Sequence, residues 1–340
     1  MWRSAWIELR DFDAIVVDES QSLKGRRSKA SQFMANMDAT FKYILTGTPV
    51  DRDYVDLWAQ WRFANPQLFG TNWKEFVDQW CESEQIYKQG QPIPYVTKAK
   101  LLEERIEEFM SIMKPYSFHI PKQQVPELSV VVHPVRLPTR IRKLYNELKE
   151  EGIIEFEEDG LASSMSNVFS LIVKLAQMTS GLVKDDEGVL HSLDTTKIDT
   201  VIELIKTHDE PAVVFCRFVA DMDRLVERLP KKYKVAQIRG GRKDDPKSKW
   251  DVMVVQVQSG SESIDLSRSR FVYFVGLPYS YIKWYQAVSR VHRRGQTRPV
   301  TAYIMNVAQT IDEAIWTIVK DKGSLSQDIY RMLKKQSKLY

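Results

Sequence analysis

The chain has 340 residues, of which 43% are hydrophobic and 28% are charged, and its formal net charge is +4. This length suits two domains that each bury a core, and the composition is that of a soluble globular protein. The two cysteines, Cys81 and Cys216, have no ligand-like spacing, which argues against a disulfide framework and a zinc site. Without a signal peptide or an apolar segment of membrane-spanning length, we expect a cytoplasmic protein with no membrane partner.

The first predicted element is a short apolar strand that ends in two carboxylates, within Asp13-Ala-Ile-Val-Val-Asp-Glu-Ser-Gln21. Open α/β sheets bind ligands at the carboxyl ends of their strands. Asp18 could hold Mg²⁺ through its waters, and Glu19 could orient or deprotonate a water that attacks a phosphate. A strand that simply runs into an acidic turn would explain the same residues.

A second apolar strand leads into a tight polar loop, in Phe41-Lys-Tyr-Ile-Leu-Thr-Gly-Thr-Pro49. Gly47 and Pro49 mark the turn. The alternative is an ordinary strand and turn. The aromatic side chains that follow are interpreted as the packed core of a helical region and not as platforms for stacking bases; they are Trp58, Trp61, Phe63, Trp73, Phe76 and Trp80.

The middle of the chain is predicted to be mainly helical. Helices are expected over 101–110, 141–150 and 169–178, an extended segment over 125–135, and a polar connector over 181–193. The acidic stretch from Glu150 to Gly160 is expected to be a surface loop. These features divide the chain into a first α/β lobe (1–135), a helical linker region (136–192) and a second α/β lobe (193–340).

The second lobe alternates strands and helices, which predicts a parallel sheet. Its five expected strands are 211–216, 234–238, 252–257, 271–275 and 301–305. The loop after the third of these contains Ser259, Gly260 and Ser261, whose hydroxyls and amides could contact the phosphates of a nucleic acid. A plain polar loop between a strand and a helix fits this composition equally well.

The last motif begins on a helix predicted from Tyr281 onward. Gln286, Arg290 and Arg293 have the spacing i, i+4 and i+7, which would place them on one helical face. Two guanidinium groups suit an oxyanion with charge spread over several oxygens, such as a phosphoryl group in transfer. A solvated basic face is the alternative. Gly295 suits the left-handed residue that closes a helix.

Three of these strings resemble motifs of the Swi/Snf-like branch of superfamily 2 helicases, a family of DNA-dependent ATPases. Gln286-Ala-Val-Ser-Arg-Val-His-Arg-Arg-Gly-Gln296 is similar to the last motif of the family, and Leu45-Thr-Gly-Thr-Pro49 to an earlier one. Asp18-Glu-Ser-Gln21 resembles the Asp-Glu-x-His box, with Gln21 where the family has histidine.

The resemblance implies an α/β fold of two RecA-like, parallel-sheet lobes of the P-loop NTPase type, with ATP and Mg²⁺ as cofactors. It assigns Asp18 to the metal, Glu19 to the attacking water, and Arg290 and Arg293 to arginine fingers, with Gln286 beside the nucleotide. Residues that match the family's coupling elements between nucleotide and DNA are Gln21, Thr46, Gly47 and Thr48.

No phosphate-binding string Gly-x-x-x-x-Gly-Lys-Ser/Thr occurs in the sequence, and only seventeen residues precede Asp18. We therefore expect a first lobe truncated at its N-terminus, with an unpaired apolar sheet edge. A partner chain could supply the missing part.

The expected function is part of an ATP-dependent translocase or helicase that moves on double-stranded DNA. The alternatives are a non-catalytic nucleic-acid-binding or regulatory subunit, and one half of a split enzyme. The compact second lobe, without a large insertion, favours a bacterial or phage origin.

Overall fold

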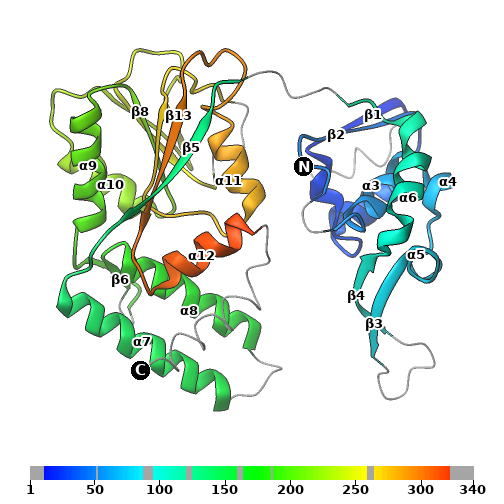
Figure 1. Ribbon diagram of the computed structural model, residues 1–340, viewed down its shortest axis with the longest axis horizontal. Helices are drawn as coiled ribbons and strands as arrows, with labels where there is room; N and C mark the ends of the chain where they lie inside the picture. The colour runs from blue at the N-terminus through cyan, green and yellow to red at the C-terminus, as the bar shows by residue number, and fades with distance from the viewer. Residues whose placement is uncertain are drawn as a thin grey trace. The chain divides into compact units, whose positions relative to one another are not determined.

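A computed structural model describes residues 11–50, 53–86, 95–119, 125–158, 164–184, 187–258 and 264–321. The chain forms two compact units, Met1–Pro121 and Lys122–Tyr340, shown in Figure 1. Each has its own buried apolar clusters. No helix among the described residues combines the length and the apolar character needed to cross a membrane.

The first unit is built on a small parallel sheet. Its elements are β1 (Phe12–Asp18), η1 (Ser20–Leu23), α2 (Lys29–Ala35), β2 (Ala39–Leu45), α3 (Asp56–Ala64), α4 (Pro66–Phe69), α5 (Trp73–Trp80), β3 (Cys81–Ile86), β4 (Tyr95–Leu101), η2 (Glu103–Arg105), α6 (Ile106–Met113) and η3 (Lys114–Tyr116). Strands β1 and β2 pair in parallel, with Asp18 opposite Leu45. β3 and β4 form a separate antiparallel hairpin.

Aromatic side chains fill the core of the first unit. Trp58, Phe76 and Trp80 are buried, and Phe69 stacks on Phe109 with ring centroids 4.2 Å apart. These contacts join α3, α4, α5 and α6 through large apolar surfaces. The prediction that this stretch is core packing is confirmed for these residues.

The second unit contains a larger sheet. Its elements are β5 (Leu128–Pro134), α7 (Thr139–Glu158), α8 (Ser164–Thr179), β6 (Leu182–Lys184), β7 (Leu190–Ser192), α9 (Thr196–His208), β8 (Ala212–Cys216), α10 (Val219–Arg228), β9 (Val235–Arg239), β10 (Arg242–Lys243), β11 (Val252–Gln256), β12 (Phe271–Phe274), α11 (Tyr281–Val288), β13 (Val300–Asn306) and α12 (Ile311–Lys320). The sheet order is β10-β9-β11-β8-β12-β13-β5. All neighbours are parallel except β10 and β9.

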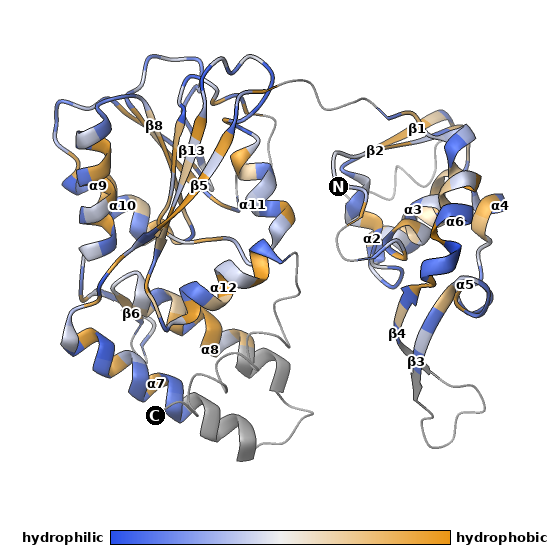
Figure 2. Ribbon diagram, viewed as in Figure 1, coloured by the Kyte–Doolittle hydropathy of each residue, from blue (hydrophilic) through white to orange (hydrophobic). Residues whose placement is uncertain are grey.

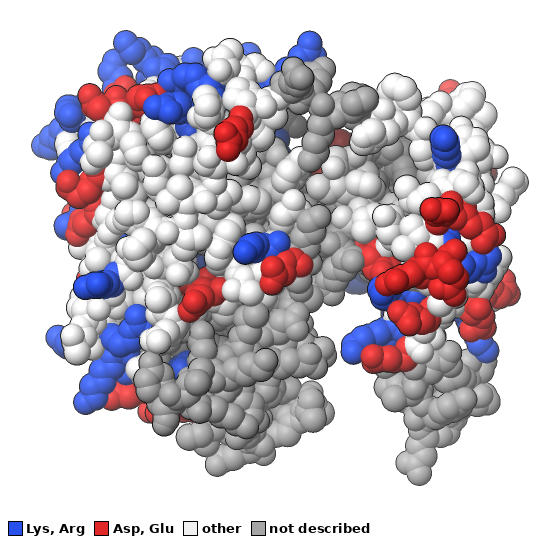
Figure 3. Space-filling model, viewed as in Figure 1, with Lys and Arg blue, Asp and Glu red and all other residues white. Residues whose placement is uncertain are grey.

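Helices cover this sheet on both sides, with α9 and α10 on one face and α11 on the other (Figure 1). Every residue of β8 and β12 is buried, as expected for central strands of a parallel sheet. Figure 2 shows the corresponding apolar strands in the interior of the unit. Lys and Arg side chains gather at the top of the unit, where most strands begin (Figure 3). The predicted α/β class with parallel sheets is confirmed.

Three features of the second unit differ from the sequence predictions. α7 continues to Glu158, where we expected a loop from Glu150, because glutamates favour helices and one glycine, Gly152, costs only about 1 kcal/mol. The predicted connector 181–193 contains the hairpin β6–β7. β5, assigned from sequence to the first lobe, pairs with β13 in the sheet of the second unit; the predicted domain boundaries as such stay predictions.

A histidine packed among aromatic rings makes the stability of the second unit depend on pH. His208 stacks on Phe271 at 4.1 Å between centroids, and its Nδ1 lies 2.6 Å from the Tyr273 hydroxyl. Burial and the charge of Arg270 lower the pKa of His208, with Glu210 opposing them. The folded protein therefore holds a neutral imidazole, whereas the unfolded chain binds a proton near pH 6.5.

Since the unfolded state binds more protons below that pH, this site should reduce stability as the pH falls from about 6.5 towards the lower pKa of the folded state. We expect His208→Gln to flatten the pH dependence of the free energy of unfolding in this window. Urea unfolding at a series of pH values measures it. An unchanged slope in the variant would show that His208 does not titrate differently in the two states.

Candidate nucleotide and coupling site

The carboxylate box and the Thr-Gly-Thr-Pro loop lie at the same end of the small sheet. Because β1 and β2 are parallel and Asp18 pairs with Leu45, the residues after each strand emerge side by side. Asp18 and Glu19 are exposed there. The structure thus brings together the predicted metal and water residues with the predicted coupling loop.

A chain of hydrogen bonds joins these two motifs. The Gln21 side-chain amide donates to Glu19 Oε2 at 2.5 Å, and the Thr46 hydroxyl donates to Gln21 Oε1 at 2.6 Å. The backbone N–H of Thr48 in turn donates to Thr46 Oγ1 at 3.0 Å. An amide can donate and accept at once, so Gln21 can connect the two motifs although it stands where the Asp-Glu-x-His box that it resembles has histidine.

The backbone at Glu19 has a conformation that is uncommon for residues other than glycine. Its φ and ψ are 52° and 49°, and its N–H donates to Asp18 Oδ1 at 2.9 Å. Such left-handed residues cost on the order of 1–3 kcal/mol and cluster at functional sites. The turn places the Glu19 carboxylate beside Gln21.

A buried glutamine forms hydrogen bonds to both motifs. Gln60 on α3 is fully buried; its Oε1 accepts from the Ser20 hydroxyl at 2.7 Å, and its amide donates to Pro49 O at 2.8 Å. It thereby ties the residue after Glu19 to the end of the Thr-Gly-Thr-Pro loop. Sequence reasoning missed Gln60, although a lone glutamine inside an aromatic-rich helix was the available signal.

The motif from Gln286 to Gln296 in the second unit does not form the continuous helix that we predicted. α11 ends at Val288, and tighter turns follow, in which Arg290 N–H donates to Ala287 O at 3.2 Å and Val291 N–H to Val288 O at 3.0 Å. Arg290 and Arg293 thus lie beyond the last residue of α11, although His292 N–H still donates to Val288 O at 2.8 Å in the helical pattern. Gly295 does have a positive φ, 96°, as predicted, but it closes this series of turns.

Arg293 is held by the loop that precedes β12. Its Nη1 donates to Ile264 O at 3.2 Å, and its Nε lies 3.9 Å from Asp265 Oδ2. Burial alone would raise the pKa of Asp265, but hydrogen bonds from Ser267 and the charge of Arg293 outweigh it, so the pKa is lowered. Arg290 meets the same loop through its backbone, where Leu266 N–H donates to Arg290 O at 2.8 Å.

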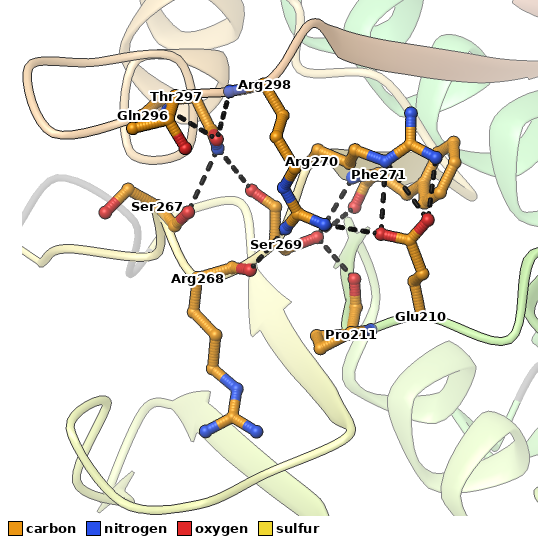
Figure 4. Close-up of polar contacts among 10 residues, drawn as sticks. All are labelled: Glu210, Pro211, Ser267, Arg268, Ser269, Arg270, Phe271, Gln296, Thr297 and Arg298. Atoms are coloured by element: carbon orange, nitrogen blue, oxygen red, sulfur yellow. Dashed lines mark hydrogen bonds and ion pairs between the residues drawn. The ribbon is translucent and has the colours of Figure 1, made fainter.

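The last residues of the motif have a structural role. Gln296 is buried, and its amide donates to Ser267 O at 3.0 Å and Ser269 O at 2.7 Å, as Figure 4 shows. Glu210 accepts from both Arg270 and Arg298, with ion pairs of 2.6 and 2.7 Å. These contacts connect the loops that precede β8, β12 and β13.

The described residues fit part of a nucleotide site. No group of three or more His, Cys, Asp or Glu side chains in the described ranges could enclose a metal ion. Asp18 and the adjacent Glu19 suit Mg²⁺, which keeps several waters and binds through one or two carboxylates. No phosphate-binding loop exists in the sequence to hold the rest of ATP. The predicted nucleic-acid residues Ser259, Gly260 and Ser261 lie outside the described residues.

Comparison with known proteins places the chain in a family. The family model named SNF2-related domain matches residues 3–181, and the model named helicase conserved C-terminal domain matches residues 196–295. The C-terminal part of the Fun30 ATPase domain, a solved structure, is similar with a TM-score of 0.50 and 16% identity, over 64% of this chain and 99% of that chain. At that identity the similarity supports the fold alone.

Curated relatives match nearly the whole chain. An uncharacterized ATP-dependent helicase of Mycoplasma genitalium, MG018, is 26% identical over 94% of this chain and 31% of the relative. The mouse SWI/SNF-related matrix-associated actin-dependent regulator of chromatin subfamily A member 1 is 19% identical over 88% of this chain and 30% of that protein. The chain thus spans about a third of the length of these relatives. The resemblance predicted from the motifs is confirmed: the chain belongs to the SNF2-related family, and its residues 196–295 match the helicase conserved C-terminal domain.

Proposed function

We propose that this chain forms part of an ATP-driven motor that moves on double-stranded DNA, with ATP and Mg²⁺ as its cofactors. The observation that carries the proposal is the hydrogen-bond chain from Glu19 through Gln21 to Thr46. These hydrogen bonds connect the carboxylate proposed to act on the attacking water with the loop from Thr46 to Pro49, which the resemblance assigns to coupling between nucleotide and DNA. A purely structural loop would not need this connection to an exposed carboxylate.

Each charged residue of the site has a distinct proposed role. Asp18 would hold Mg²⁺, and Glu19 would orient and deprotonate the attacking water. Bound Mg²⁺ would neutralise charge on the phosphate oxygens. Arg290 and Arg293 stabilise the charge that develops on the transferred phosphoryl group, and Gln286 contacts the nucleotide.

The first unit supports a further part of the proposal, namely that a further polypeptide segment, not contained in this sequence, completes the first lobe. One face of the β1–β2 sheet carries exposed apolar side chains, including Val16 (56% exposed), Phe41 (55%), Tyr43 (52%) and Leu45 (53%). Parallel sheets are normally covered on both faces and need more than two strands. The missing segment would cover this face and carry the phosphate-binding loop.

The test is a fusion that restores the missing segment. The front of the first lobe of an SNF2-family helicase, with its Gly-x-x-x-x-Gly-Lys-Thr loop, is joined ahead of Asp11, and ATP hydrolysis is measured with and without double-stranded DNA. We expect duplex-stimulated turnover that Glu19→Gln lowers by about 10²-fold or more, since general-base catalysis typically contributes that much.

Turnover that survives Glu19→Gln would contradict the assigned role. A fusion that binds the duplex but never hydrolyses ATP would favour the second candidate, a non-catalytic nucleic-acid-binding or regulatory subunit. The absence of a phosphate-binding loop from the sequence is the observation that favours this alternative.

A further inference from the structure

The edge of the large sheet at which most strands begin carries a row of exposed basic side chains. We name this row the basic rim and define it as Lys231, Lys232, Lys234, Lys247, Lys249 and Arg268. They come from three loops, which precede β9, β11 and β12. In Figure 3 this edge lies at the top of the second unit, where blue side chains gather.

Contacts between the loops make the rim one continuous surface. Lys234 N–H donates to Asp251 Oδ2, and Asp251 N–H donates back to Lys234 O, both at 2.8 Å. The guanidinium of Arg268 lies over the buried ring of Trp250, 5.5 Å from its centroid. These contacts connect the loop before β11 to the loops before β9 and β12.

The charges of the rim are not neutralised within the described part of the chain. Arg270 and Arg298, which lie next to it, share Glu210 as an ion-pair partner, whereas no rim residue forms an ion pair with a described side chain. The acidic groups in the same loops satisfy backbone donors: Asp251 accepts from Lys234 N–H, and Asp245 accepts from Lys247 N–H at 2.9 Å. The six basic side chains outnumber the three carboxylates of the loop before β11, Asp244, Asp245 and Asp251, so the rim presents a positive field to an external anion.

The spacing of the strands indicates which polyanion fits. β9, β11, β8 and β12 are consecutive neighbours in the sheet, and strands lie about 4.8 Å apart, so the rim spans about 15 Å. Double-stranded DNA carries one negative charge per about 1.7 Å of its axis, or about nine over that length. An extended acidic peptide rises about 3.3 Å per residue and presents every second side chain on one face. Over the same length it would offer only about two negative charges to the rim.

A single strand is a poorer match, because non-specific binding of single strands relies on exposed aromatic rings. Trp250 is only 1% exposed and lies beneath Arg268. We propose that the basic rim binds a second segment of double-stranded DNA through its phosphates. This inference rests on the proposed action of the protein on double-stranded DNA.

The rim differs in location from the nucleic-acid loop predicted from the sequence. Lys247 and Lys249 precede the first residue of β11, whereas Ser259, Gly260 and Ser261 follow its last residue. Five residues of strand separate these two ends by about 15 Å. A protein with both surfaces could hold two duplex segments at once.

The test compares two triple variants of the full chain with the same change in charge. Lys231, Lys247 and Lys249 are replaced by glutamate in the rim variant, and Lys174, Lys184 and Lys320, exposed elsewhere on the second unit, in the control variant. Binding of a fluorescent duplex of about 20 bp is measured by anisotropy between about 50 and 200 mM salt, without ATP.

For the rim variant we expect the affinity for the duplex to fall at least about tenfold. The slope of the logarithm of the binding constant against the logarithm of the salt concentration should fall in magnitude by about 2 to 3, since each lost phosphate contact removes about 0.9 from that slope. The control variant should retain its affinity within about threefold and keep the salt dependence of the unsubstituted chain. Lys→Gln substitutions at the rim should give affinities between those of the rim variant and the unsubstituted chain. Only protein with an intact rim should carry a labelled duplex onto beads that bear a second duplex.

Equal loss of affinity for the duplex in the rim and control variants, or a rim variant that binds the duplex as tightly as the unsubstituted chain, would overturn the proposal. So would a rim variant that loses binding to polyglutamate while keeping its affinity for the duplex. Because no step uses ATP, failure here is distinguishable from failure of the proposed motor, which is judged by turnover of the fusion.

Discussion

Replacing Arg293 with alanine should lower ATP turnover of the completed motor by about 10³- to 10⁵-fold, the range found where arginine fingers have been studied. The guanidinium would act only as charge develops on the transferred phosphoryl group, so the loss should appear in kcat. Binding of double-stranded DNA should change by less than about twofold, because one contact at most is lost. Steady-state hydrolysis with the fusion protein measures the first quantity, and anisotropy the second.

The neighbouring Arg294 provides a matched control. It is exposed and has no proposed part in the nucleotide site, so Arg294→Ala should leave turnover unchanged. Arg293 also contacts Ile264 O and approaches Asp265 in the structure. If Arg293→Ala lost DNA binding together with turnover, Arg293 would be positioning that loop, and its role as an arginine finger would be wrong.

Replacing Lys197 with methionine should destabilise the second unit by about 3–5 kcal/mol, the usual cost of breaking a buried ion pair by removing one partner. Lys197 Nζ lies 2.6 Å from Asp312 Oδ2, and the two side chains are 2% and 11% exposed. The Thr179 hydroxyl also donates to Asp312 Oδ1 at 2.9 Å. The pair thereby joins α8, α9 and α12, and its loss leaves Asp312 buried without its cation.

The melting temperature should fall by on the order of 10 °C, since each kcal/mol shifts it by about 2–4 °C in a domain of this size. Lys206→Met is the matched control on the same helix, α9. Lys206 pairs with Glu203 at 2.7 Å, but the two side chains are 41% and 69% exposed, so its loss should cost less than about 1 kcal/mol. Equal melting temperatures for the two variants would contradict the assigned contribution of the buried pair.

Strands β1, β2, β8, β9, β11, β12 and β13 could be predicted from sequence because each is a short apolar run bounded by polar turns, whereas the largely polar hairpin strands β3 and β4 could not. The position of Asp18 and Glu19 at the end of β1 followed from that pattern alone. The contact between Gln21 and Thr46 could not be predicted, since it depends on the parallel pairing of β1 with β2.

Other differences have local physical causes. Val291 continues the apolar period of α11 and is fully buried, yet a tight turn buries it as well as a helix would, so the end at Val288 was not evident. β5 joins the second unit by pairing with β13, far along the chain, which no local pattern reveals. Localisation and the individual catalytic roles stay predictions.

ATP hydrolysis by this chain alone, with and without double-stranded DNA and beside Glu19→Gln, bears most directly on the proposed function. We predict no turnover, because the sequence contains no phosphate-binding string Gly-x-x-x-x-Gly-Lys-Ser/Thr, together with duplex binding that weakens as salt increases. Duplex-stimulated turnover that is lost in Glu19→Gln would contradict this prediction, because the chain would then complete its own nucleotide site.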